Sequence, residues 1–148
     1  MLHARVFKSL AVALILAGCA APKPAPPPPH IGPPPAALCE VAPVNVADGG
    51  IASVTMRVSS EGGYCAARLT TSAGKPFDSY LLPIEPSHGT AKITRYDGKT
   101  SLEYTPNTLF AGQDSFTGKL IIKGRDRYTT LTVNVTVVAP GAAAGKAK

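Results

Sequence analysis

The chain has 148 residues and a net charge of +6, from 15 lysines and arginines against 9 acidic residues. The basic residues are spread out and are not interleaved with aromatic side chains, so we expect no nucleic-acid partner. Once a leader and a proline-rich stretch are set aside, about a hundred residues remain to fold, which is enough for one domain and too few for two.

The first 18 residues have the pattern of a secretory signal peptide. Arg5 and Lys8 supply a positive start, and residues 10–17 are uninterruptedly apolar, which is the usual arrangement of such leaders. The apolar run is shorter than the roughly 20 residues that a membrane-spanning helix needs. We therefore expect residues 1–18 to be removed from the mature protein.

The leader ends in Leu16-Ala17-Gly18-Cys19, which resembles the bacterial lipobox. The resemblance implies that Leu16, Ala17 and Gly18 are recognised by the signal peptidase, and that Cys19 is acylated and becomes the first residue. Two or more acyl chains anchor a protein firmly, so membrane lipid is the expected partner of Cys19. In lipoproteins of this kind, an aspartate directly after the cysteine is the signal for retention in the inner membrane, and Ala20 stands there instead. This favours the outer membrane facing the periplasm over the inner membrane, and surface exposure is left open. The alternative is an ordinary signal peptide that happens to contain a cysteine.

A proline-rich linker follows, over residues 19–37 when Cys19 is included. Residues 20–37 hold nine of the 15 prolines, and proline fixes φ and lacks a backbone donor, so neither helix nor sheet is expected. As polyproline II at about 3.1 Å per residue, this stretch would reach roughly 55 Å. We interpret it as a spacer, and a ligand for a proline-recognising or wall-binding partner is the alternative. At the other end, residues 141–148 are rich in alanine, glycine and lysine, and we expect a disordered tail.

The predicted folded domain, residues 38–140, consists of short strands. Apolar and polar residues alternate with period two in most of its segments, and no segment has helical periodicity. The expected strands are residues 38–46, 51–59, 64–70, 78–84, 90–96, 101–105, 115–123 and 128–138. Pro83 limits the fourth segment to the edge of a sheet. Short strands separated by glycine-rich turns predict an all-β, antiparallel sandwich of about seven strands.

Four motifs in this domain together resemble the bacterial Ig-like, cadherin-like repeat. They are Pro86-Ser87-His88-Gly89-Thr90, Tyr104-Thr105-Pro106-Asn107, Gly112-Gln113-Asp114-Ser115-Phe116 and the alternating residues 132–137. The similarity covers residues 83–138 well and residues 38–82 loosely. It implies an Ig-like fold with a corner at residues 104–116. It implies no particular activity, because such modules occur in adhesins, wall enzymes and many other envelope proteins.

Each residue of the corner has an expected role. Tyr104 and Phe116 are predicted core aromatics, Pro106 ends a strand, and Gly112 permits the sharp change of direction. Asp114 is expected to cap nearby backbone N–H groups as an Asx-type turn, so its loss should cost of order 1 kcal/mol. In related tandem arrays, acidic residues near domain junctions bind calcium, so a calcium ligand is the alternative role for Asp114. No other metal ligand and no cofactor is expected.

The three cysteines have different expected fates. With Cys19 carrying lipid, Cys39 and Cys65 remain as two thiols in an oxidising compartment. A disulfide between them would tie the first edge strand to a neighbouring strand and close a loop of about 26 residues, which is worth roughly 3 kcal/mol. Two independent free thiols are the alternative.

The chain lacks the common catalytic signatures, including the nucleophile elbow, the His-Glu-x-x-His zinc motif, the phosphate-binding loop and the Cys-x-x-Cys pair. His88 is the only histidine of the predicted domain, and we interpret it as a turn residue. The sequence therefore predicts a lipid-anchored, non-enzymatic envelope protein that presents one Ig-like binding or structural module to an envelope protein or wall polymer. An accessory lipoprotein subunit of a secretion, pilus or envelope assembly machine is the main alternative, and an envelope enzyme is a weaker one.

Overall fold

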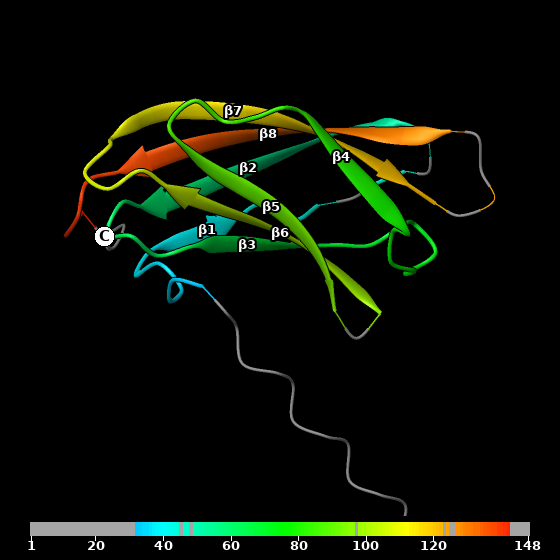
Figure 1. The fold of residues 1–148 in the computed structure, drawn as a ribbon, viewed down its shortest axis with the longest axis horizontal. Coiled ribbons are helices and arrows are strands. Elements are labelled where there is room, and N and C mark those ends of the chain that lie inside the picture. The colour runs from blue at the N-terminus through cyan, green and yellow to red at the C-terminus, as the bar shows by residue number, and fades with distance from the viewer. Residues whose placement is uncertain are drawn as a thin grey trace, which may run out of the picture. The chain divides into compact units, whose positions relative to one another are not determined.

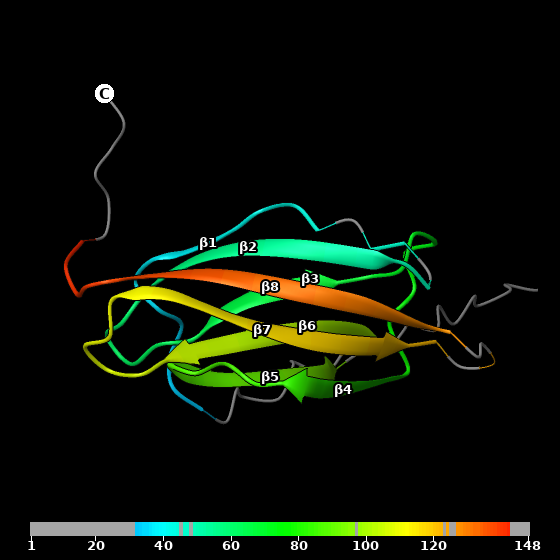
Figure 2. The same ribbon diagram turned by 90° about the horizontal axis from the view of Figure 1, so that it is seen from above.

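The computed structural model describes residues 32–44, 46–47, 49–96, 98–122, 124 and 127–142, and these residues form eight strands and no helix. The strands are β1 (Cys39–Val41), β2 (Ile51–Ser59), β3 (Cys65–Leu69), β4 (Ser79–Ile84), β5 (Gly89–Tyr96), β6 (Lys99–Pro106), β7 (Gly112–Ile121) and β8 (Tyr128–Val138). They lie in two sheets with the orders β1-β2-β8-β7-β4 and β3-β6-β5, which Figure 1 and Figure 2 show as two layers. The all-β prediction is confirmed, with eight strands rather than about seven.

The core lies between the two sheets and follows from the alternation in the sequence. Successive side chains of a strand point to opposite faces, so one face of each strand can be apolar throughout. The buried residues include Ala52, Val54, Met56 and Val58 of β2, Cys65, Ala67 and Leu69 of β3, and Leu131, Val133, Val135 and Val137 of β8. Full burial of a valine or leucine side chain is worth about 1.5–3 kcal/mol, so these alternating faces supply much of the driving force for folding.

The pairing of the strands departs from the prediction at one ladder. We expected an antiparallel sandwich, but β2 runs parallel to β8, with Ile51 opposite Thr130 and Ser59 opposite Val138. Parallel neighbours cannot be joined by a tight hairpin and need a crossover connection. Here the five strands β3 to β7 provide that connection, because the chain leaves β2 for the smaller sheet and returns to the larger sheet only later.

The first predicted strand is divided in two. Of the predicted strand, only the part that forms β1 pairs with β2, and the pairing ends at Pro43, which has no N–H group with which to continue the ladder. Val46 is then buried and forms an isolated bridge with Thr71, just beyond the end of β3. Residues 38–46 therefore leave one sheet and reach the other, because proline interrupts the ladder between them.

The end of the proline-rich stretch packs on the sandwich. The Tyr64 N–H group donates to the Pro34 carbonyl at 3.0 Å, and the Ala36 N–H group donates to the Tyr64 carbonyl at 2.8 Å. A Cβ atom on Gly63 would lie 2.4 Å from the Cα atom of Ala36, so glycine permits this close approach. Proline lacks a donor but keeps its carbonyl, which is how residues expected in the linker join a bridge.

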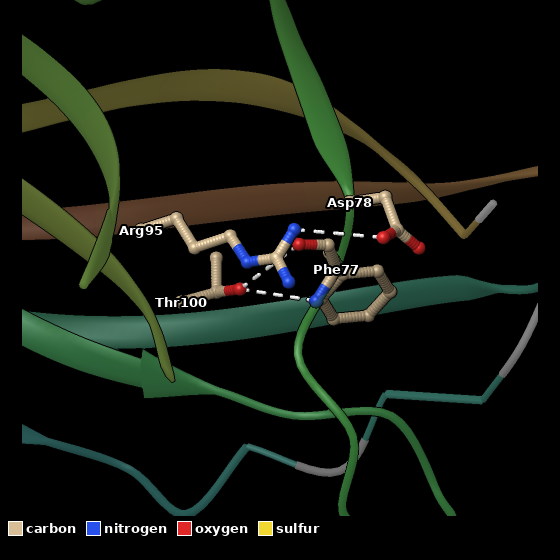
Figure 3. Close-up of polar contacts among 4 residues, drawn as sticks. All are labelled: Phe77, Asp78, Arg95 and Thr100. Atoms are coloured by element: carbon tan, nitrogen blue, oxygen red, sulfur yellow. Dashed lines mark hydrogen bonds and ion pairs between the residues drawn. The ribbon is translucent and has the colours of Figure 1, made fainter. Parts of the chain in front are cut away.

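The connection that leads into β4 is fixed to the smaller sheet (Figure 3). The buried Phe77 donates its N–H group to the Thr100 hydroxyl at 3.0 Å, and Arg95 lies 3.5 Å from the Asp78 carboxylate. Thr100 and Arg95 belong to β6 and β5. The exposed ion pair contributes at most about 1 kcal/mol, so the buried bond to Thr100 is the stronger restraint on where β4 begins.

Candidate binding site

Asp114 is the centre of a hydrogen-bonded corner of the sandwich. It lies in β7 with 8% of its surface exposed. Its Oδ1 atom accepts hydrogen bonds from the amides of Ser87 at 3.0 Å and Ser115 at 2.9 Å. Its Oδ2 atom accepts from the His88 amide and the Tyr104 hydroxyl, both at 2.9 Å. A carboxylate offers about four acceptor positions, and all four are in use here.

This carboxylate joins segments that are far apart in the sequence. Ser87 and His88 belong to the turn between β4 and β5, where the chain passes from one sheet to the other. Their N–H groups have no partner in a ladder, and Asp114 supplies the acceptor for both in part-buried hydrogen bonds. From the sequence, Asp114 was expected to cap backbone N–H groups as an Asx-type turn. It does accept from three backbone N–H groups, but only the Ser115 amide is local, and the amides of His88 and Ser87 lie 26 and 27 residues away in the sequence.

Two aromatic rings form the floor of this corner. Tyr104 and Phe116 are 0% and 1% exposed, and their rings stack with centroids 5.8 Å apart. Both therefore lie in the core, as the sequence indicated. Gly89 packs against the Tyr104 ring, since a Cβ atom there would lie 2.7 Å from that ring and 2.6 Å from the Thr105 carbonyl. The glycine that follows His88 is thus required by close packing.

The loop before β7 completes the corner. Pro106 is the last residue of β6, and Gly112 is the first residue of β7. Gly112 has φ of 152°, and a Cβ atom on it would approach the Phe110 ring to 3.1 Å. The His88 ring stacks on the Phe110 ring, with centroids 4.0 Å apart. His88 is therefore positioned by an aromatic contact as well as by its amide bond to Asp114.

The charge state of the corner follows from these contacts. Burial raises the pKa of Asp114, but the hydrogen bonds from His88, Ser87, Tyr104 and Ser115 outweigh it, so the pKa of this carboxyl is below its usual range. Burial raises the pKa of Tyr104, and the bond to the Asp114 carboxylate raises it further. Asp114 is thus ionised and Tyr104 is neutral at neutral pH.

The same contacts bear on the calcium alternative for Asp114. A cation would have to replace N–H and O–H donors that already point at both carboxylate oxygens. Within the part of the chain that the structure describes, no group of three histidine, cysteine or acidic residues could hold a metal ion. The arrangement around Asp114 is that of a structural carboxylate.

An open pocket of about 350 Å³ adjoins this corner. It is lined by Ser87, His88, Gln113, Asp114, Ser115 and Asn134. Two of the lining amides are themselves held, because Asn134 donates to the Ser53 hydroxyl at 3.3 Å and Gln113 accepts from the Thr136 hydroxyl at 3.2 Å. No site was expected at Gln113, Ser115 or Asn134 from the sequence. Their outward positions in two alternating strands are the signal that could have brought them together.

The predicted disulfide is confirmed. Cys39 and Cys65 are bonded, with Cα atoms 5.1 Å apart, which is within the usual range of about 4.4–6.8 Å. The bond joins β1 to β3, and these strands lie in different sheets rather than side by side in one. We call residues 34–41, together with Tyr64 and Cys65, the N-terminal brace.

A polar cluster lies beside the brace. The Leu38 amide donates to the Ser59 hydroxyl at 3.0 Å, and that hydroxyl donates in turn to the Glu61 carboxylate. The Gly141 amide also donates to Glu61, at 3.3 Å. These bonds, led by the one from Ser59, lower the pKa of Glu61. The beginning and the end of the described domain are thereby tied to the same turn after β2.

The predicted lipidation site lies elsewhere in the chain. Leu16, Ala17, Gly18 and Cys19 are outside the described residues, as are most of the linker and residues 143–148 of the tail. Among the residues that are described, none belongs to a helix that is long and apolar enough to cross a membrane. The lipobox therefore stays a prediction from the sequence.

Comparisons with known proteins assign no family. No protein-family model and no curated protein matches the chain. Among solved structures, an endo-fucoidan hydrolase of glycoside hydrolase family 107 is similar over 64% of this chain, with 20% identity and a TM-score of 0.40, and this chain spans 12% of its length. A cysteine protease inhibitor from Entamoeba histolytica is similar over 63% of this chain and 92% of its own length, with 16% identity and a TM-score of 0.31. Likenesses this distant decide neither the fold family nor the function.

Proposed function

We propose that the chain is a lipid-anchored cell-envelope protein that presents a single, non-catalytic Ig-like module. The observation that carries the proposal is the Cys39–Cys65 disulfide. Such bonds persist in oxidising compartments outside the cytosol, in agreement with an exported chain. The bond also accounts for two of the three cysteines, so Cys19 of the lipobox-like sequence is the one left for lipid.

The strand order supports the Ig-like assignment. If β2 is taken as the first strand, the smaller sheet has the order second, fifth, fourth, and the larger sheet contains the third, sixth and seventh strands side by side. Immunoglobulin-type sandwiches have the same grouping. The strand β2 lies beside the last strand rather than beside the second, and β1 is an addition at its outer edge.

The use of Asp114 supports a non-catalytic role. A general base must be free to accept a proton from a substrate, whereas both oxygens of Asp114 are engaged by protein donors. The neighbouring His88 ring is stacked on Phe110. These groups act together to hold the turn between β4 and β5 against β7.

The edge strand β4 favours the second candidate, an accessory subunit of an envelope assembly. As predicted for a strand containing Pro83, β4 lies at the end of its sheet and pairs only with β7. Tyr80, Leu81 and Ile84 of this strand are 42%, 58% and 58% exposed. An apolar edge strand is a surface on which another protein can add a strand or pack.

The proposed lipid anchor is tested by substituting Cys19. In cells that process lipoproteins, Cys19→Ser should move the protein out of the membrane fraction or leave the leader uncleaved. The matched control is Cys39→Ser, which removes a different cysteine and should leave the protein in the membrane fraction. Normal cleavage together with unchanged membrane partition of Cys19→Ser would refute the lipid anchor.

The two candidate roles are separated by cross-linking in intact membranes. Leu81→Lys places a charge on the exposed edge of β4 without touching the core. If the protein is an assembly subunit, wild type should yield a defined cross-linked partner that Leu81→Lys loses. If cross-linking is the same for both proteins, the assembly candidate is rejected.

A further inference from the structure

The pocket beside Asp114 has a hydrogen-bonding lining in which Asp114 is the only acidic residue. Apart from Asp114, its lining residues are Ser87, His88, Gln113, Ser115 and Asn134. Hydroxyls and side-chain amides can both donate and accept hydrogen bonds. The Asp114 carboxylate forms part of the wall, but its lone pairs already accept protein donors.

This lining selects against ionic ligands. An anion would meet no cation among the lining residues, and a cation would compete with the donors that surround Asp114. Without a counter-charge among these residues, an anion gains no ion pair to offset the water that it loses. The hydroxyls of a sugar both donate and accept hydrogen bonds, as the hydroxyls and side-chain amides of the lining residues do, so a sugar suits this lining.

The lining is held in place before any ligand arrives. The Asn134 amide bonds to Ser53, the Gln113 amide bonds to Thr136, and the backbone of Ser87 is fixed by Asp114. Side chains that are already ordered lose less conformational entropy on binding. This matters for a sugar, because its hydroxyls exchange water for protein with only a small net gain per hydrogen bond.

A polar track continues from the pocket across the outer face of the larger sheet. The register places Thr55 and Ser115 on either side of Asn134, and it places Ser53 and Thr117 on either side of Thr132. All six side chains carry a hydroxyl or an amide, and the cations Arg57 and Lys119 stand in the rows beyond them on the same face. Outward residues recur about every 6.8 Å along a strand and about every 4.8 Å between strands, so the groups form a regular grid that an extended chain could follow.

We propose that this pocket, with the adjoining rows on β2, β8 and β7, binds a neutral polysaccharide. The pocket volume of about 350 Å³ is at the small end of the range of roughly 300–1,000 Å³ for ligand sites, which suits a short segment of a longer chain. The inference rests on the proposed role as an envelope binding module and names its partner class as a wall or capsular glycan without charge.

The test is a titration of the full chain, extracted in detergent, with defined oligosaccharides. The neutral probes are a tetramer of N-acetylglucosamine and a tetramer of glucose, and the anionic probe is a tetramer of galacturonic acid. The pocket variant is Gln113→Ala combined with Asn134→Ala. The control is Ser101→Ala on β6, in the other sheet, and the unfolding midpoints of all three proteins are measured alongside.

The expected result is binding of at least one neutral tetramer by wild type and by Ser101→Ala, with an affinity about tenfold or more lower in the pocket variant. Three results would overturn the proposal: no binding of either neutral tetramer at millimolar concentration, equal binding by the pocket variant with an unchanged midpoint, or preference for the anionic tetramer. Loss of a cross-linked protein in the pocket variant would also overturn it, in favour of a protein ligand. Membrane fractionation of Cys19→Ser gives a separate result, so a chain that is anchored but binds no sugar refutes the glycan site alone.

Discussion

The N-terminal brace and the Asp114 corner both connect the two sheets, and they do so by different means. In the brace, a covalent bond joins β1 of the larger sheet to β3 of the smaller one. In the corner, one carboxylate in β7 accepts hydrogen bonds from Tyr104 of β6 and from the turn before β5. The first connection responds to reductant, and the second responds to pH.

The difference follows from how much each region buries. The strand β1 has three residues, none of which is buried, so it can gain little from apolar contact and depends on a disulfide to stay in place. The corner includes the buried Tyr104, Phe116 and Asp114. The buried Tyr104 hydroxyl and Asp114 carboxylate must be paired, and a carboxylate with four acceptor positions serves this hydroxyl and three amides with one side chain.

The largest effect is expected from removing the aromatic floor of the corner. Phe116→Ala leaves a cavity under Tyr104, and truncation of a buried phenylalanine costs about 3–5 kcal/mol of a total that is typically about 5–15 kcal/mol. Urea unfolding measures the loss. Leu109→Ala, at a side chain that is 77% exposed, is the control and should change stability by less than about 0.5 kcal/mol. A similar small change for Phe116→Ala would show that packing does not hold the corner.

Removing the disulfide of the brace should lower the free energy of unfolding of the protein by about 3 kcal/mol. The combined variant Cys39→Ala and Cys65→Ala is compared with wild type by unfolding with and without reductant. Reductant should lower the stability of wild type to that of the variant and leave the variant unchanged. If the oxidised wild type and the variant are equally stable, β1 is held by its other contacts and the comparison between brace and corner fails.

Asp114→Ala should cost about 2–3 kcal/mol, which is more than the value of order 1 kcal/mol expected for a local cap. The reason is that the amides of Ser87 and His88 and the hydroxyl of Tyr104 all lose their acceptor, while water entering from the adjoining pocket limits the cost. Unfolding measures the loss, and faster hydrogen exchange at the two amides locates it. Gln113→Ala, at the preceding and exposed position, should be nearly neutral. A loss of 1 kcal/mol or less for Asp114→Ala, with unchanged exchange, would return Asp114 to the role of a local cap.

The smallest expected effect is on how the free energy of unfolding depends on pH. The pKa of Asp114 is lower in the folded protein than in the unfolded chain, so its contribution is fully present above the ordinary aspartate pKa of about 3.9 and is lost as pH falls below it. Asp114→Asn removes this titration. Unfolding free energies measured from pH 7 to pH 2.5 should therefore fall more steeply for wild type than for Asp114→Asn. Glu61, whose pKa is also lowered, titrates in both proteins and cancels in the difference, and parallel curves would contradict the assignment.

The strands themselves were predictable because they depend on local pattern. The alternation in β2 and β8 identifies their buried faces without any knowledge of their neighbours, and Pro83 identifies β4 as an edge strand. The disulfide was predictable too, because only two cysteines remain once Cys19 is set aside. These inferences need only the geometry of a strand and the count of a residue type.

The sequence by itself determined the fold class, the core faces of the strands and the disulfide between Cys39 and Cys65. Only the tertiary structure decided that β2 runs parallel to β8, that residues 34–36 join the sandwich, and that Asp114 caps Ser87 and His88. The physical reason is the range of the interactions. Side-chain alternation acts within a strand, whereas a buried carboxylate takes its donors from whatever segments the packing of two sheets brings within about 3 Å, and no local pattern records which segments those are.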